Sequence, residues 1–349
     1  MRVEKMMEFN DIIESTNKVR GHMQDDLSRK IYDCRIMNTL TYDYKYITAI
    51  TKDGVDVFCR LRKMLEPYIN KYDLIIDGAG FYGKSIKATL TDVEWTCICD
   101  RSVHGGEDWD IPLLTRKEAV KKYPQAVFVI SSVLYGVEIE NELRSLGVRN
   151  IINMGKTLAE YTDADPKQYY DVFTFDKDEI IADVGCFDCE SILQYFNYAN
   201  REYYSFEPEP KQYVKCKDII KEGHYSDWDI YNYGVYDNNS KLYFSSNSSS
   251  TKISKDGDIE VDVIKLDDFF KTHEAPTFIK MDIEGAELAA LKGCAETISK
   301  YKPKLAICVY HKPEDIFEIP EYILSLNPDY KMWLRHYTNL INETVLYCE

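Results

Sequence analysis

FIKMDIEGAELAALKG, residues 278–293, joins a short apolar strand to a helix through a turn rich in carboxylates. Similar apolar runs precede it in EIIADVG (179–185) and EYYSFEP (202–208) and follow it in KLAICVY (304–310). Short apolar strands separated by helices predict a parallel sheet that is covered on both faces. The fold class is therefore α/β.

Other runs complete this sheet. DIYNYGVY (229–236) is expected to be one further strand, and the serine-rich segment after it, 242–266, to be a polar hairpin or flap. The last runs, DYKMWLRHY (329–337) and ETVLYCE (343–349), predict two strands joined by a turn. A parallel sheet that ends in an antiparallel hairpin is typical of the class I, Rossmann-like methyltransferase fold.

The N-terminal half predicts a second, smaller Rossmann-like unit. Helical spacing indicates a helical segment over residues 1–68, and four strands alternate with helices over 69–160. The polar segment TDADPKQYYD (162–171) resembles a linker. The predicted organisation is a helical segment (1–68), a small α/β domain (69–160) and a larger α/β domain (161–349).

A glycine motif marks the small domain. Gly78, Gly80 and Gly83 form G-x-G-x-x-G directly after a strand, and Asp100 ends the next strand. This arrangement can bind a dinucleotide, with the phosphates at the helix N-terminus and the acid on a ribose hydroxyl. The same glycines also allow close helix–strand packing with no ligand. A scaffold or docking role is favoured over nucleotide binding.

Composition excludes several classes of function. The net charge of −16 disfavours nucleic acid as a partner, and no apolar run approaches the length of a membrane span. Residues 1–10 lack the apolar core of a signal peptide, and the ten cysteines are scattered, which predicts reduced thiols in the cytoplasm. Cys186 and Cys189 form C-x-x-C without a second ligand pair at finger-like spacing, so no metal site is expected.

Acidic residues end successive strands of the larger domain. Asp183 and Gly185 end one strand and Glu207 ends the next, at the edge of the sheet where Rossmann-like folds bind ligands. Gly185 would let a ligand approach the backbone, and Asp183 could orient an amino group. Glu207 could accept hydrogen bonds from two ribose hydroxyls. Asp282 and Glu284 follow a third strand, where acids can serve a site or merely cap a helix.

From about residue 170 onward the chain resembles the FkbM-type methyltransferases. The resemblance is carried by IIADVGCFDCES (180–191), YYSFEPEP (203–210), EVDVIKLDDFF (260–270), FIKMDIEGAELAALKGC (278–294) and KPKLAICVYHKPEDIFEIPEYI (302–323). It implies S-adenosylmethionine as cofactor and O-methylation of sugars in polysaccharides, glycolipids or natural products. The cofactor-binding residues expected from it are Asp183, Gly185, Cys186, Phe187, Asp188, Ser191, Glu207, Pro208, Gly234 and Asp282.

One residue departs from that family, which usually has glycine where this chain has Cys189. A positive φ at Cys189 would cost about 1 kcal/mol and could crowd the cofactor, whereas a negative φ would tolerate a small thiol. A negative φ is expected.

Methyl transfer to a hydroxyl requires alignment of the acceptor oxygen and removal of its proton. Asp282 is the first candidate for the general base, followed by Glu284 and His311. The carboxylates could instead hold a divalent cation, which is not expected. The N-terminal helices could pack on the next domain or join two copies of the chain.

Two other functions remain open. A binding or assembly protein could retain a methyltransferase-like fold without catalysis, and a nicotinamide-dependent oxidoreductase could be built on GAGFYG (78–83). The second leaves FIKMDIEGAE (278–287) unexplained.

Overall fold

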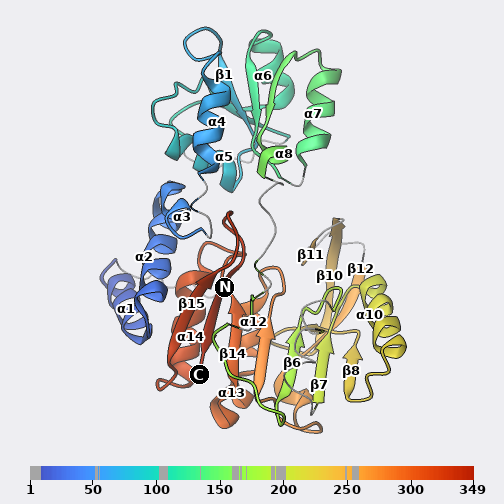
Figure 1. Ribbon diagram of the computed structural model, residues 1–349. Coiled ribbons are helices and arrows are strands. Elements are labelled where there is room, and N and C mark those ends of the chain that lie inside the picture. Colours follow the sequence, from blue (N-terminus) through green and yellow to red (C-terminus); the bar gives the residue numbers. More distant parts are fainter. Residues whose placement is uncertain are drawn as a thin grey trace, which may run out of the picture. The chain divides into compact units, whose positions relative to one another are not determined.

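The structure is a computed structural model that describes residues 9–51, 54, 56–101, 109–133, 135–158, 165, 167–169, 171–189, 193, 202–247, 250–253 and 259–349. The chain forms two compact units (Figure 1). The C-terminal unit comprises Met1–Tyr32, Pro166–His336 and Asn342–Glu349, and the N-terminal unit comprises Asp33–Asp165 and Tyr337–Ile341. These bounds differ from the predicted ones, because the first 32 residues belong to the C-terminal unit.

A seven-stranded sheet forms the centre of the C-terminal unit. Its order is β15-β16-β14-β13-β6-β7-β8, and β16 alone runs antiparallel to its neighbours. The strands are β6 (Ile180–Val184), β7 (Glu202–Phe206), β8 (Trp228–Tyr231), β13 (Phe278–Met281), β14 (Lys304–Cys308), β15 (Met332–His336) and β16 (Thr344–Cys348). This confirms the α/β class and the terminal antiparallel hairpin.

Helices and a smaller sheet complete this unit. The helices are α1 (Phe9–His22), α10 (Pro210–Glu222), α11 (Leu266–Phe269), α12 (Glu287–Lys292), α13 (Ala295–Tyr301) and α14 (Asp315–Leu326). α10 begins at Pro210 because Glu209 accepts the Gln212 N–H as an N-cap and proline suits the first helical position. It packs beside β8 (Figure 1).

The polar segment after β8 forms a separate sheet in the order β11-β10-β12-β9. The strands are β9 (Gly234–Val235), β10 (Ser240–Asn247), β11 (Ser250–Ile253) and β12 (Ile259–Ile264). The expected single strand 229–236 is therefore wrong: it divides into β8 and β9, which belong to different sheets. Residues 248 and 249 of the serine run lie outside the described residues.

Residues near the start of the chain cover the edge of the main sheet. Gln24 N–H donates to the Met332 carbonyl (2.9 Å), and Met23 forms a parallel bridge with Met332. The buried Ser28 hydroxyl accepts the Leu334 N–H (3.0 Å), and Arg335 pairs with Asp25 (2.7 Å). Strand β15, the first of the sheet, thus has partners on its outer side.

The N-terminal unit has a five-stranded parallel sheet in the order β3-β2-β1-β4-β5. Its strands are β1 (Leu74–Asp77), β2 (Cys97–Asp100), β3 (Leu113–Thr115), β4 (Val127–Ile130) and β5 (Asn150–Asn153). Its helices are α3 (Lys45–Thr48), α4 (Val57–Leu65), α5 (Phe81–Thr89), α6 (Arg116–Lys122), α7 (Gly136–Ser145) and α8 (Met154–Leu158), and α2 (Asp26–Thr41) spans both units. The expected four strands omit β3, whose three half-buried residues give a weak pattern.

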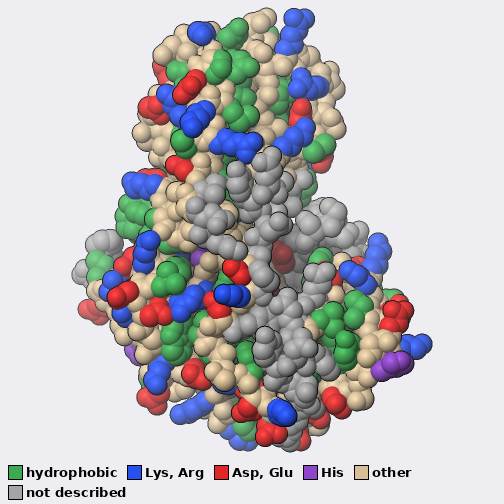
Figure 2. All heavy atoms as spheres, viewed as in Figure 1, with side chains coloured by type: hydrophobic (Ala, Val, Ile, Leu, Met, Phe, Trp, Pro, Cys, Tyr) green, Lys and Arg blue, Asp and Glu red, His purple; other side chains and the backbone are tan. Residues whose placement is uncertain are grey.

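The surface carries side chains of both charges, as expected from 43 basic and 59 acidic residues. On the face shown in Figure 2, acidic and basic side chains are intermixed. Within the described residues, no helix combines the length and apolarity required to cross a bilayer.

Candidate active site

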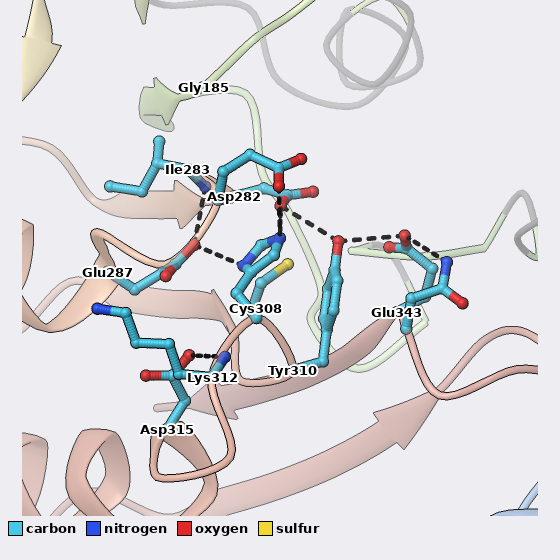
Figure 3. Close-up of polar contacts among 12 residues, drawn as sticks. Gly185, Asp282, Ile283, Glu287, Cys308, Tyr310, Lys312, Asp315 and Glu343 are labelled. Carbon is cyan, nitrogen blue, oxygen red and sulfur yellow. Dashed lines mark hydrogen bonds and ion pairs between the residues drawn. The ribbon is translucent and has the colours of Figure 1, made fainter. Parts of the chain in front are cut away.

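The candidate site lies at the carboxyl ends of β6, β7, β13 and β14, four neighbouring strands of the main sheet. Asp282 follows β13, and Tyr310 and His311 lie just beyond β14. Because parallel strands end at one edge of a sheet, these residues meet although they are far apart in the sequence. Figure 3 shows the Tyr310 hydroxyl pointing toward Asp282 and Glu343, and Glu287 pointing toward the Ile283 N–H, below Gly185.

His311 is surrounded by three carboxylates. Its Nδ1 lies 2.9 Å from Glu287 Oε1, and its Nε2 lies 3.4 Å from Asp282 Oδ1 and 3.9 Å from Glu284 Oε2. Burial opposes a charge on the ring, but the pair with Glu287 and the charges of Asp282 and Glu284 raise the His311 pKa to about 9. At neutral pH His311 is therefore an imidazolium, which suits an electrostatic role better than that of a base.

Glu287 is fixed by the same turn. Its side chain is fully buried, and its Oε1 accepts the Ile283 N–H (2.8 Å) while facing His311. Asp282, Glu287 and His311 place ligand atoms within 4.8 Å of one another, a spacing that could hold a cation. The positive charge of His311 opposes that use.

Two tyrosines hold the other side of Asp282. The Tyr169 hydroxyl donates to Asp282 Oδ2 (2.9 Å), and the Tyr310 hydroxyl lies 3.4 Å from Asp282 Oδ1 and 3.1 Å from Glu343 Oε1. Burial and the charge of Asp282 raise the Glu343 pKa, and Gln168 donates to Glu343 Oε2 (2.6 Å). Asp282 itself remains about a quarter exposed, so it can still meet a ligand.

Asp183 has a partner within the protein. Its carboxylate is fully buried 2.9 Å from Lys280 Nζ, and Lys280 also donates to the Gly185 carbonyl (2.7 Å). Burial raises the Asp183 pKa, and Lys280 opposes this. Burial also works to lower the Lys280 pKa, but the charges of Asp183 and Asp282 outweigh it and raise that pKa. Asp183 thus forms a buried ion pair with Lys280 next to Gly185, and its expected role toward a cofactor amino group stays a prediction.

Glu207 holds the loop that follows β6. Its Oε2 accepts the Phe187 N–H (2.9 Å) and its Oε1 accepts the Glu209 N–H (2.8 Å). Burial raises the Glu207 pKa to about 7, against the effect of these two N–H donors. Phe187, whose backbone N–H binds this carboxylate, is half exposed to solvent, which is unusual for a large apolar residue.

The expected negative φ at Cys189 is wrong, because Cys189 has φ +65° and Phe187 has φ +48°. The thiol of Cys189 is fully buried with Cys186 and Cys216, so the turn adopts the left-handed conformation without glycine. Such a conformation costs about 1 kcal/mol at a non-glycine residue.

The other predicted cofactor residues lie around this loop. Gly185 has φ +84°, and a Cβ there would overlap the Asp282 carbonyl oxygen, so close packing alone requires this glycine. Gly234 lies in β9, and a Cβ added there would point toward the side chains of Val263 and Pro208. Asp188 is half-buried in the turn, and Ser191 lies outside the described residues.

In the N-terminal unit, the glycine motif is largely explained by packing. A Cβ at Gly83 would overlap the Gly78 carbonyl, and one at Gly78 would overlap the Ser131 hydroxyl. Asp100 Oδ2 accepts the Ala79 N–H (2.8 Å), so this acid fastens the glycine loop itself. Gly80 has open space around its Cα and is the N-cap residue of α5, with φ −75°.

Several site residues were not predicted. Tyr169 and Gln168 fall in the expected linker, yet both are buried at the site, so the linker interpretation is wrong for them. Lys280 could have been found, because a lysine inside an apolar strand needs a buried partner. Glu343 and Tyr310 give no pattern that marks them.

Part of the chain is similar to a known protein family, and its fold is similar to solved structures. Residues 183–340 match the family described as the methyltransferase FkbM domain. The crystal structure of methyltransferase FkbM from Methylobacillus flagellatus is similar, with a TM-score of 0.50 and 23% identity over 85% of this chain and 96% of that one. At this identity the likeness concerns the fold.

More distant solved structures cover half of the chain. An rRNA methylase from Streptococcus thermophilus has a TM-score of 0.35 and 14% identity, over 50% of this chain and 87% of that one. Precorrin-6y C5,15-methyltransferase from Geobacter metallireducens has a TM-score of 0.35 and 7% identity, over 50% and 81%. No curated protein matches the chain.

Proposed function

We propose that the C-terminal half of this chain, whose residues 183–340 match the methyltransferase FkbM domain, is an S-adenosylmethionine-dependent methyltransferase that methylates a hydroxyl group of a carbohydrate or related small molecule. The observation that carries the proposal is the partly exposed Asp282, held by Tyr169 and beside the charged His311, at the carboxyl edge of the sheet.

The residues present fit the cofactor. Glu207 is a nearly buried carboxylate at the tip of β7 with lone pairs for ribose hydroxyls, and Phe187 offers an exposed ring beside it for the adenine. Carboxylates outnumber cations among the site residues described above, which suits a sulfonium and an ammonium group. When bound, the cofactor supplies a methyl group on a positively charged sulfur leaving group.

The protein's own task is to position the acceptor and take its proton. We assign Asp282 as the general base: its carboxylate would take the proton of the acceptor hydroxyl, whose oxygen the site would hold toward the methyl group that the cofactor would supply. Tyr169 and His311 orient this carboxylate. Glu284, about a third exposed at the mouth of the turn, is proposed to contact the acceptor.

The polar surroundings favour oxygen chemistry on a polar acceptor. Tyr310 and Glu343 offer further hydrogen bonds next to Asp282, as a sugar with several hydroxyls would use. A carbohydrate or small hydroxylated metabolite is therefore proposed as acceptor, and no divalent cation is assigned to the site.

The test begins with Asp282→Asn. Purified protein is incubated with methyl-labelled S-adenosylmethionine and a glycan fraction, and the product is treated with mild base, which cleaves methyl esters but leaves ethers. We expect ether-linked label in the wild type and a loss of rate of about 10²–10⁴-fold in Asp282→Asn. Calorimetry measures the cofactor affinity of the variant, so that a loss of rate at saturating cofactor can be assigned to the missing base and not to weaker binding.

Glu314→Gln is the control, because Glu314 is exposed in the same loop and outside this network. Label that mild base releases would contradict ether formation. No heat at millimolar cofactor would favour the non-catalytic binding protein instead.

A further inference from the structure

Three buried cysteines converge beneath the loop that follows β6. Cys186 and Cys189 come from this loop and Cys216 from α10, and their Sγ atoms all lie within 4.8 Å of one another. Their exposed fractions are 2%, 0% and 0%. The proposed methyl transfer uses none of the three thiols.

The backbone is built to bring these thiols together. The Cys189 N–H donates to the Cys186 carbonyl (2.8 Å), which closes the C-x-x-C turn and places both side chains on one side. Phe187 and Cys189 adopt left-handed conformations to make this turn, and such strain persists where a specific arrangement requires it. The Cys216 Sγ lies 3.1 Å from the Phe187 carbonyl and completes the cluster.

Three sulfurs match a thiolate metal site better than a disulfide. A disulfide would use two of them and leave the third unused, and burial shields all three from oxidants. A tetrahedral zinc ion with Zn–S bonds of about 2.3 Å separates its sulfurs by roughly 3.8 Å, which small side-chain rotations can reach here.

We propose that Cys186, Cys189 and Cys216 bind one zinc ion that fastens the 186–189 turn to α10. Each thiol loses its proton as its sulfur–zinc bond forms, so binding releases three protons and involves no change of oxidation state. The ion would fix the turn in which the Phe187 N–H donates to Glu207. It would thereby hold in place the two residues proposed to contact the adenine and the ribose of the cofactor.

The experiment uses the full chain, expressed without a histidine tag in zinc-supplemented medium and purified without chelators. Elemental analysis should find about one zinc per wild-type chain and per Cys294→Ser chain, whose cysteine is buried away from the cluster. Cys216→Ser and Cys189→Ser should each lose most of the metal. Removing zinc from the wild type should lower its melting temperature.

Cobalt provides a second measurement that needs only the wild type, in case the variants fail to fold. Loading with Co²⁺ should produce strong thiolate-to-cobalt charge-transfer bands in the near ultraviolet. The proposal is overturned if the wild type retains no zinc and shows no such bands, or if Cys216→Ser and Cys189→Ser retain as much metal as Cys294→Ser. A thiol count two lower in denatured, unreduced protein would show a disulfide and also overturn it.

These outcomes are independent of the reaction. Methyl transfer with no bound metal would refute the zinc site alone, and zinc without transfer would refute the proposed function alone.

Discussion

Glu207 shows how one residue can link ligand binding to pH. Its pKa is raised to about 7 by burial in the ligand-free protein, so it is only half ionised at neutral pH. Two ribose hydroxyls would favour the charged form, because a carboxylate accepts from both. Cofactor binding at this residue should therefore expel a proton below pH 7.

This predicts a pH-dependent affinity. Between pH 8 and pH 6 the dissociation constant for S-adenosylmethionine should rise by about tenfold, since only the ionised fraction of Glu207 binds well. Calorimetry across this range measures it. Glu207→Gln should bind more weakly throughout and lose most of the pH dependence; an unchanged profile would place the ribose elsewhere.

His311 makes a different prediction, about stability. Its pKa of about 9 in the folded protein exceeds the ordinary value of 6.5, so the charged ring contributes fully below pH 6.5 and the contribution is lost as pH rises through 9. The stability lost should be about 3 kcal/mol. Urea unfolding of the wild type at pH 6.5, 7.5, 8.5 and 9.5 measures this decline.

His311→Gln is the matched variant. It should be less stable at pH 6.5, because Glu287 is left buried without a cation, and its stability should change less between pH 6.5 and 9.5. Parallel curves for variant and wild type would assign the titration to another group.

At the scale of elements, β13 organises the site. Lys280 belongs to β13, and Asp282 follows the last residue of this strand, Met281. Lys280 also lies opposite Asp183 in the register of β13 and β6, which puts the two charges side by side. β13 thus supplies the buried cation, and the turn directly after it supplies the proposed base.

Removing this cation should be costly. Lys280→Met leaves Asp183 buried without a partner, and the expected loss is about 3–5 kcal/mol in the free energy of unfolding. Urea unfolding followed by circular dichroism measures it. Lys241→Met, which breaks an exposed pair with Glu260, should change the free energy of unfolding far less than Lys280→Met does, because solvent screens this pair. A similar loss in both variants would contradict the role given to burial.

The elements predicted from sequence are those with strong local patterns. The apolar strands β6, β7, β13 and β14 and the final hairpin were all expected, because burial on both faces requires continuous apolar runs. The candidates Asp282, Glu284 and His311 do meet in space, since strand ends share one edge.

Residues without a local pattern could not be predicted. Tyr169 comes from a segment whose proline and acids indicate a linker, and only its tertiary contact with Asp282 reveals its use. Cys216 looks like any apolar residue of a helix until the fold brings it to Cys186 and Cys189. The φ of Cys189 depends on the packing of the turn, which sequence spacing does not encode.

At the scale of the molecule, two features argue against a nicotinamide-dependent oxidoreductase. The motif glycines Gly78 and Gly83 are required by packing, and the Asp100 carboxylate is occupied by the Ala79 and Arg101 N–H groups. The acidic net charge of −16 adds a general repulsion of phosphates.

Titration with NADH should therefore leave its fluorescence unchanged up to millimolar protein, while a lactate dehydrogenase run in parallel gives the usual enhancement. A saturable change in NADH fluorescence would instead support dinucleotide binding by residues 78–83. Gly80, which has open space around its Cα, would then be the expected point of contact.

The contact of residues 23–28 with β15 determines which fragments of this chain can be expressed on their own. A shortened gene that began at residue 161 would encode every strand of the main sheet yet omit the segment that occupies the outer side of β15. The freed amide and carbonyl groups of that strand would then be open to pairing with a neighbouring molecule. Such a fragment would self-associate, and only one that also carried the first 32 residues would behave as a monodisperse catalytic half.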